Sequence, residues 1–585
     1  MARSLVLLAA VLMLRSAGPS VVSAQNLPAE IIRYADVVLY NGKILTVNEN
    51  FDIVQGVTIR DGRFLAVGDD ARVLSMAGPE TTRIDLQGKT VVPGFIATDA
   101  DNDFAGGNLY KDTQVNGQIL ETLKDIEKED VLVRVREMLK DAPSGEMAFF
   151  RFDRQSKVTE LTKEDLDKVT PNNPVWAGKD SSGVANSLLL EKVLKILPKD
   201  HPHILKDERT GEPNGRLYGF AHGVVGWDLR PWPPVEQYVE EQKRMIDELN
   251  AEGVTTLIGH IQGFTLSIFN VLVHRGELNI RVRGSHDFLR QNGFAESYLR
   301  RLGNLVDFGL GDMVQIVGGG LQAIDGNAYD GSALTMKPKR NLGPYLQGPY
   351  GTNHWLGYGA HENRLDDPSL DRSMTEWTSV MAAIKYGWNF TAMHNVGDRA
   401  MAIWIEAIEK GLAQPDLALK PQFRPFGLDH NLYWSDSQTE RVKKLDIRRG
   451  LGKMWQRPDM AVELYGEAIH DVQPVPHLIE QGLKVHIEGS HPLEEIQHYV
   501  TRKDDKGRIW GPDHAIDRKT ALRMKTLWAA RFIAEDDRLG SIEPGKLADL
   551  VVLGEDYLTV SDSRLAQIPV DMTVVEGRIV YRGLQ

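Results

Sequence analysis

The stretch VVPGFIATDADND, residues Val91–Asp103, decides the fold that we expect for this chain. It begins as a short apolar run bounded by turn residues, which is typical of a buried strand. It ends in carboxylates, and because side chains two positions apart share one face of a strand, Asp99 and Asp101 should project together from its C-terminal end. In a parallel β/α barrel that end carries the active site, whereas elsewhere the two acids would only cap the following loop. Spacing alone leaves both interpretations open.

The region after this stretch repeats short apolar strands, most of them preceded by helix-like sequence, which argues for a parallel sheet. The expected strands are 91–98, 254–259, 280–285, 313–317, 389–393, 424–429, 448–454 and 483–489. Eight such units predict an α/β fold, a TIM-like (β/α)8 barrel over residues 91–535. Residues of about 105–235 do not fit one crossover and predict an inserted subdomain, and about 326–370 predict a lid loop.

Both ends of the mature chain carry β-hairpin signals. Asn41-Gly42 and Asp61-Gly62 each separate two apolar runs, and Gly577 lies between two more near the C-terminus. The economical interpretation is one small β-sandwich built from residues 25–90 and 536–585. Two unrelated hairpin modules are the alternative.

The composition of the chain indicates which classes of binding partner to expect. The 585 residues are 42% hydrophobic and 25% charged, which is ordinary for a globular protein, and the formal net charge of -13 comes without a strong basic run. We therefore expect a small-molecule substrate and no nucleic acid, and we leave open a homo-oligomer. The chain has no cysteine, so it forms neither disulfides nor a lipid-linked cysteine.

Residues 1–24 have the features of a secretory signal peptide. Arg3 supplies the positive start, Leu5–Leu14 is apolar, and Val22-Ser23-Ala24 offers small residues before a cut. The apolar run is too short for a membrane anchor, and no later segment approaches that length. We expect an exported protein, periplasmic or secreted, without a membrane span.

Five of the 16 histidines end predicted strands. They are His260, His286, His394, His430 and His491. In a barrel these ends converge on one pocket, although a lone histidine at a strand end is more often a hydrogen-bonded loop anchor. Together with the two aspartates they offer imidazole and carboxylate ligands that suit zinc, manganese or ferrous iron.

Several of these motifs resemble the amidohydrolase superfamily, and within it the amidohydrolase-3 branch that includes N-substituted formamide deformylase. Pro93-Gly94-Phe95-Ile96 match the first barrel strand of that superfamily, and Gly540–Leu553 resembles its exit from barrel to sandwich. The segment Asn173–Ser187 resembles the branch itself. The resemblance implies a metal-dependent hydrolase on a barrel that also carries a small β-sandwich.

The resemblance also assigns ligands. The run Met393–Ala400 is similar to the family motif on the fifth strand, and Arg424–His430 to that on the sixth, so His394 and His430 are expected to bind metal. Asp398 and Arg399 belong to the first motif and are expected to orient ligands or cap the next helix.

Other family positions differ in this chain. Asp99 and Asp101 stand where the family has two histidines, and His491 stands where it has an aspartate that serves as general base. Gln315 stands where a lysine, when carbamylated, bridges two metals, so we expect a mononuclear centre. His491 could act as a ligand or as a base, because histidine titrates near neutral pH.

The resulting prediction is an exported hydrolase that cleaves a non-peptide C–N bond in an amide, N-acyl or N-formyl compound through a metal-activated water. Asp99, Asp101, His394 and His430 would hold the metal, and His491 would move the proton. The residues expected near substrate or ligands are His260, His286, Gln315, Asp398 and Arg399. The alternative is a lyase, an isomerase or a non-catalytic binding protein, because a fold does not fix a function.

Overall fold

The protein is described here from a computed structural model. The structure describes residues 33–100, 119–123, 127–152, 161–179, 182–229, 234–261, 263–286, 310–320, 324–325, 333, 335–336, 375–417, 425–452 and 458–583. The predicted signal peptide, Asp101 and nearly all of the predicted lid loop lie outside these ranges.

Eight parallel strands form two four-stranded sheets at the centre of the molecule, in the orders β17-β16-β15-β8 and β18-β19-β20-β21. They are β8 (Phe95–Ala97), β15 (Val254–Ile261), β16 (Arg281–His286), β17 (Val314–Gly319), β18 (Met393–Asn395), β19 (Phe426–His430), β20 (Ile447–Leu451) and β21 (Val485–Ile487). Each overlaps one of the strands predicted from the sequence. The predicted α/β architecture with parallel strands is therefore present.

Single bridges join the edges of the two sheets. Gly319 at the end of β17 pairs with Phe390 in parallel, and Thr98 after β8 pairs with Gly489 in antiparallel. Within the described residues these single contacts do not make a continuously hydrogen-bonded, closed barrel. The closed (β/α)8 form thus stays a prediction, although the bridges bring the ends of β8 and β21 together.

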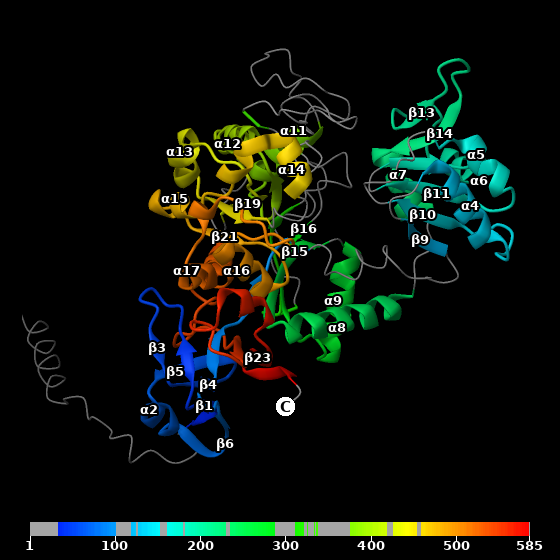
Figure 1. The fold of residues 1–585 in the computed structure, drawn as a ribbon. Coiled ribbons are helices and arrows are strands. Elements are labelled where there is room, and N and C mark those ends of the chain that lie inside the picture. The colour runs from blue at the N-terminus through cyan, green and yellow to red at the C-terminus, as the bar shows by residue number, and fades with distance from the viewer. Residues whose placement is uncertain are drawn as a thin grey trace, which may run out of the picture.

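Helices cover the outer faces of these sheets, and α12, α13, α15, α16 and α17 lie around β19 and β21 in Figure 1. The helices of this part are α8 (Val235–Ala251), α9 (Gly263–Arg275), α11 (Thr375–Lys385), α12 (Asp398–Leu412), α13 (Thr439–Lys444), α14 (Pro458–Tyr465), α15 (Val475–Glu480), α16 (Pro492–Thr501), α17 (Arg518–Lys525) and α18 (Leu527–Phe532). The amphipathic α8 buries Met245, Ile246 and Leu249 against Leu257 and other apolar side chains of β15. Alternate residues of the strands therefore face the helices, and the remainder face inward.

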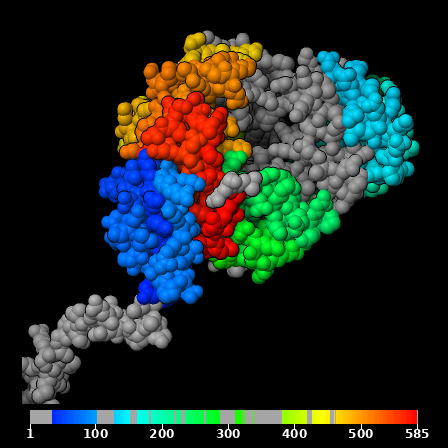
Figure 2. Space-filling view, turned by 60° about the horizontal axis from the view of Figure 1, so that its bottom comes forward, coloured from blue at the N-terminus to red at the C-terminus, as the bar shows by residue number. Residues whose placement is uncertain are grey.

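The two ends of the chain share one six-stranded sheet, in the order β24-β23-β22-β7-β2-β3, next to a four-stranded sheet β5-β4-β1-β6. The strands are β1 (Ala35–Tyr40), β2 (Lys43–Leu45), β3 (Ile53–Val54), β4 (Gly56–Arg60), β5 (Arg63–Gly68), β6 (Ala77–Asp85), β7 (Thr90–Pro93), β22 (Leu550–Leu553), β23 (Val570–Val575) and β24 (Arg578–Arg582). Side chains of both sheets, such as Ile59 and Val552, form one apolar core. Figure 2 shows the N-terminal strands in blue against the C-terminal segment in red.

A further six-stranded sheet, in the order β13-β14-β12-β11-β10-β9, lies within the predicted insertion and forms a separate body in Figure 1. Its elements are β9 (Ile119–Leu123), α4 (Lys128–Leu139), β10 (Ala148–Phe152), α5 (Lys163–Val169), β11 (Val175–Lys179), β12 (Ser182–Ala185), α6 (Ser187–Leu194), β13 (Ile204–Lys206), β14 (Pro213–Tyr218) and α7 (Gly219–Val224). The exact domain limits remain predictions. Among the described residues, no helix combines the length and the apolar character that crossing a bilayer requires.

Candidate metal centre

His430 and Glu488 meet at the ends of two strands. His430 ends β19, and Glu488 directly follows β21. The imidazole Nδ1 of His430 lies 2.8 Å from Oε2 of Glu488, and the backbone N–H of His430 donates to Oε1 at 2.6 Å. Only 2% of the Glu488 side chain is exposed, so this buried carboxylate is held by two contacts with one residue.

Asp99 completes a group of three with these two residues. It follows β8 in a left-handed backbone conformation, φ 54°, and its Oδ2 lies 3.8 Å from Nδ1 of His430. Asp99, His430 and Glu488 each place a ligand atom within 4.8 Å of the other two. Two carboxylates and one imidazole are a donor set that zinc or manganese accepts.

A second group shares the same glutamate. Asp429, His486 and Glu488 are all buried, and their ligand atoms also lie within 4.8 Å of one another. Nε2 of His486 lies 3.0 Å from the hydroxyl of Thr98, and burial lowers the pKa of His486 to about 4. His486 is therefore a neutral imidazole at neutral pH.

Glycine makes room for the shared carboxylate. A Cβ at Gly450 on β20 would lie 2.1 Å from Oε1 of Glu488 and 2.9 Å from Cε1 of His486. A Cβ at Gly452 would lie 3.0 Å from Oε2 of Glu488. Side chains at these two positions would fill the space that Glu488 occupies.

His394 flanks the cluster from β18. Its ring packs edge-to-face on that of His430, with the centroids 4.6 Å apart. Its Nδ1 lies 3.6 Å from Oδ1 of Asp325, whose carboxylate accepts hydrogen bonds from the backbone N–H groups of Val396 and Gly397. Burial lowers the pKa of His394, so its imidazole is neutral beside His430.

The electrostatics of His430 and Glu488 are those of an ion pair. Burial alone would lower the pKa of His430, but the carboxylates of Glu488 and Asp99 outweigh it and hold that pKa well above its usual range. Burial alone would raise the pKa of Glu488, but His430 outweighs it and lowers that pKa. Asp99, Asp429 and Glu488 thus face one imidazolium. A divalent cation bound there would add positive charge beside these carboxylates and would take the place of the imidazolium proton.

The remaining predicted residues lie elsewhere or act structurally. Asp398 is the first residue of α12, after the N-cap Gly397, and its Oδ1 accepts from the N–H groups of Met336 at 2.9 Å and Arg399 at 3.0 Å, which ties Met336 to the start of the helix. On the other sheet, Nδ1 of His260 lies 2.8 Å from the hydroxyl of Ser285, and Nε2 of Gln315 donates to Asp312. For His286 the structure describes only the place in β16, so the role predicted for its side chain stays a prediction.

The structure does not bring His491 to this cluster. It precedes α16, and its Nδ1 lies 2.9 Å from Oε1 of Glu252, with 62% of the His491 side chain exposed. The hydrogen bond to Glu252 raises the pKa of His491 to about 9. The ring is engaged with Glu252 on the surface, so the geometry does not support the proton-transfer role predicted for it.

The sequence analysis missed Glu488 and His486, which precede the predicted His491 by three and five residues. They alternate in the strand VHIEG, so they share one face of a buried strand. Two ionisable residues at that spacing in a buried apolar strand were the available signal. Asp429 shares the inward face of β19 with Gly427, one residue before His430.

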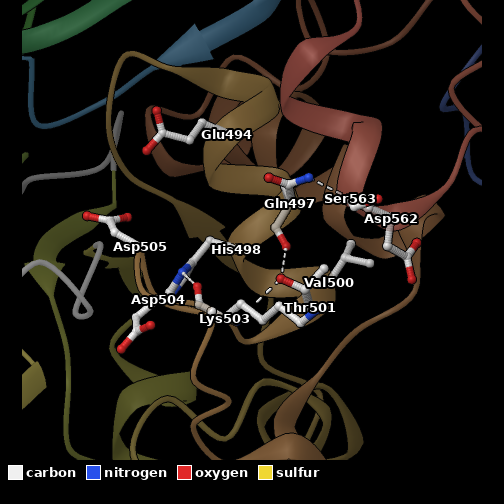
Figure 3. A pocket seen from close by; sticks show the side chains of 11 residues that line it. Glu494, Gln497, His498, Val500, Thr501, Lys503, Asp504, Asp505, Asp562 and Ser563 are labelled. Atoms are coloured by element: carbon white, nitrogen blue, oxygen red, sulfur yellow. Dashed lines mark hydrogen bonds between the residues drawn. The ribbon is translucent and has the colours of Figure 1, made fainter.

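A surface pocket lies apart from this cluster and contains none of its residues (Figure 3). It is lined by Glu494, Gln497, His498, Val500, Thr501, Lys503, Asp504, Asp505, Gly507, Asp562 and Ser563. Two of its polar side chains bond to neighbouring backbone: Gln497 donates to the carbonyl of Asp562, and Thr501 donates to that of Gln497. None of the predicted site residues lines it.

Comparison with known proteins shows that the chain is similar to amidohydrolases and metal-dependent hydrolases. The chain is 24% identical over 586 residues to N-substituted formamide deformylase of Arthrobacter pascens, covering 93% of this chain and 98% of that one. It is 24% identical to the putative amidohydrolase YtcJ of Bacillus subtilis, covering 93% and 99%. The structure of an uncharacterized metal-dependent hydrolase from Pyrococcus horikoshii matches with a TM-score of 0.64 at 22% identity, covering 90% of this chain and 99% of that one, which shows a shared fold. The model of the amidohydrolase family matches residues 82–581, and the chain therefore belongs to the amidohydrolase family.

Proposed function

We propose that this protein is a metal-dependent hydrolase that cleaves a non-peptide C–N bond in a small amide, N-acyl or N-formyl compound. The observation that carries the proposal is the cluster of Asp99, His430 and Glu488 at the C-terminal ends of β8, β19 and β21. In parallel barrels that end is where active sites lie. The bridges between the two sheets support a (β/α)8 barrel, distorted at two joints, as the scaffold.

The residues present fit a divalent cation. Three ligand atoms lie within 4.8 Å of one another, two of them from carboxylates, and the cluster holds more negative than positive charge. A cation bound there would polarise a substrate carbonyl and lower the pKa of a water molecule. The relatives support this proposal, because one is described as an N-substituted formamide deformylase and another as a metal-dependent hydrolase.

The protein residues divide the remaining work. Glu488 fixes the position of His430 through the ring and the backbone, so it sets the geometry of the centre. His394 packs edge-to-face on the His430 ring and supports its orientation from that side. Asp99 is 35% exposed, the most exposed side chain of the three, so it is placed to take up a proton released during hydrolysis.

The test is metal analysis together with activity. Protein purified without chelator should carry a divalent ion, and His430→Asn should lose the ion and the hydrolysis of a panel of N-formyl and N-acyl amines. His477→Asn is the matched control, because His477 pairs with Asp436 on the surface. Full metal content in His430→Asn would refute the centre. A metal-loaded protein that hydrolyses none of the panel would favour the lyase, isomerase or binding-protein alternative.

We also propose export, on the basis of residues 1–24. Expression of the full chain in a Gram-negative host should yield a processed product in the periplasmic fraction that begins near Gln25. An unprocessed product in the cytoplasmic fraction would reject this.

A further inference from the structure

We infer that Lys525 is a positioning residue: its ammonium fixes the backbone on both sides of Glu488, and thereby the place of the Glu488 carboxylate beside His430. Lys525 lies on α17, which packs against β21 (Figure 1). The inference deepens the proposed function and rests on it for one point, that the Glu488 carboxylate binds a cation.

The ammonium of Lys525 meets the two backbone carbonyls that flank Glu488. Its Nζ donates to the carbonyl of Gly489 at 2.6 Å and to that of Ile487 at the longer distance of 3.4 Å. Ile487 is the last residue of β21, and Gly489 is the residue after Glu488. One cationic group therefore holds the chain directly before and directly after the glutamate.

The neighbouring strands restrain the same stretch of backbone from two other directions. The N–H of Glu488 donates to the carbonyl of Leu451 on β20 at 3.1 Å, and the N–H of Gly489 donates to that of Thr98 at 2.8 Å. With Lys525, each of the peptide groups 487–488, 488–489 and 489–490 has at least one hydrogen bond that restrains it. Since the carboxylate follows its own backbone, loss of the Lys525 bonds should let it move away from His430.

Glu495 holds the ammonium from the other side. Its Oε2 lies 2.5 Å from Nζ of Lys525, and its Oε1 accepts the N–H of His491 at 2.9 Å, at the start of α16. A Cβ at Gly489, where φ is 105°, would lie 1.8 Å from Oε1 of Glu495. The Glu495 carboxylate thus packs directly against the corner at which the chain leaves β21.

The burial of this ion pair indicates a role beyond charge balance. The side chains of Lys525 and Glu495 are 0% and 5% exposed. A buried pair of this kind can often be replaced by apolar residues without loss of stability, because removing two charges from water is costly. Apolar side chains cannot supply a donor to the carbonyls of Ile487 and Gly489. The ammonium therefore serves the orientation of this corner.

The test compares Mn²⁺ binding by variants of the chelator-treated full chain, with electron paramagnetic resonance to measure free Mn²⁺. The double variant Lys525→Met, Glu495→Gln contains neither buried charge but also has no donor to the two carbonyls. Its dissociation constant for Mn²⁺ should rise about 10- to 100-fold. In Glu495→Gln alone, Lys525 keeps its bonds to the carbonyls, so the dissociation constant should stay close to that of wild type.

Arg283→Met is the matched control for loss of stability. It removes a buried cation from a pair with Glu535 at the other end of the strands. Urea unfolding should show that it is destabilised, whereas its dissociation constant for Mn²⁺ should equal that of wild type. A merely structural role of Lys525 would put the double variant in the same class as this control.

Crystal structures of the chelator-treated wild type and double variant give a second readout, which needs no metal. The wild type should keep Oε2 of Glu488 within hydrogen-bond distance of Nδ1 of His430, a contact of 2.8 Å in this structure. The double variant should lose this contact, because its Glu488 backbone is no longer held from the side of α17.

The outcomes separate this inference from the proposed function. Wild-type affinity for Mn²⁺ in the folded double variant, or an unmoved Glu488 in its crystal structure, would overturn the role of Lys525 and leave the metal centre intact. If the double variant does not fold, Lys525→Gln in the same Glu495→Gln background decides, because its shorter side chain cannot reach both carbonyls. A wild-type protein that binds no Mn²⁺ would reject the proposed centre, and the crystal structures alone would then decide the role of Lys525.

Discussion

The parallel strands carry a buried cluster of charged side chains at each end, and the two clusters differ in their ratio of positive to negative groups. At the N-terminal end, Arg281 pairs with Asp549 at 3.2 Å, Arg283 pairs with Glu535 at 2.9 Å, and Arg538 pairs with Asp312. At the C-terminal end, Asp99, Asp429 and Glu488 face the single imidazolium of His430. In the first cluster each of these acids pairs with a guanidinium, whereas the second gathers three carboxylates around one imidazolium.

This difference separates a structural cluster from a candidate functional one. The balanced cluster ties β16 to Glu535 and Asp549, residues that lead into the C-terminal strands, and it needs no ion. In the unbalanced cluster, a bound cation would offset the repulsion among the buried carboxylates, in line with the proposed function. Removing a charge should therefore destabilise the first cluster, and adding a cation should stabilise the second.

The largest expected effect is in the balanced cluster. Arg283→Met should destabilise the protein by about 3–5 kcal/mol, because it leaves the buried Glu535 without its partner. Urea unfolding measures this. Arg244→Met, in an exposed pair with Glu241 on α8, should cost under about 1 kcal/mol. Folded Arg283→Met protein should bind as much Mn²⁺ as wild type, and equal stabilities of the two variants would contradict the comparison.

The next effect is stabilisation by the cation. Mn²⁺ at 100 times its dissociation constant should raise the free energy of unfolding by about 2.7 kcal/mol. Thermal unfolding with and without chelator measures the shift. Arg283→Met should keep this shift and His430→Asn should lose it. A shift that survives in His430→Asn would place the stabilising ion elsewhere.

A smaller effect is expected from Gly450→Ala. The added methyl group overpacks the space beside Glu488, which should cost about 1–3 kcal/mol and reduce the Mn²⁺ content. Gly68→Ala is the control, since its methyl group would meet the flexible side chain of Arg72 at 3.0 Å. Unchanged Mn²⁺ content in a folded Gly450→Ala protein would contradict the need for open space at this position.

The sequence predicted the strands well because hydrophobic periodicity and turn residues are local signals. β15, β19 and β21 all lie within a residue or two of their predicted limits, and the family motifs located His430 correctly at the end of β19. Asp61-Gly62 and Gly577 correctly predicted the hairpins β4–β5 and β23–β24. The hairpin predicted at Asn41-Gly42 was wrong, because this turn carries the chain from β1 into β2, which belongs to the other sheet of the assembly. These features depend on residues that are close in sequence.

The site was predicted only in part, because its composition depends on how separate strands are placed. Asp99 and His430 do meet, and the alternation of His486 and Glu488 was a signal of ionisable residues on one face of β21, but that spacing does not show that Glu488 contacts His430. His491 was chosen by its position in a family motif, and the chain reverses at Gly489, φ 105°, before reaching it. The backbone hydrogen bond from Gly489 N–H to the carbonyl of Thr98 fixes that corner, and it joins two residues that are far apart in the sequence.

The smallest effect tests His491 itself. Its pKa is raised to about 9 by the hydrogen bond to Glu252, so the folded state favours the protonated ring. The stability from this pair is fully present below the ordinary pKa of 6.5 and is lost as pH rises through about 9. Because 62% of the side chain is exposed, solvent screening should keep the loss below about 1 kcal/mol. Thermal unfolding between pH 6 and 10 should show this slope in wild type and a flatter profile in His491→Gln, with unchanged Mn²⁺ content. If His491→Gln lost bound Mn²⁺, His491 would contribute to the unbalanced cluster, and its assignment to a surface pair with Glu252 would be wrong.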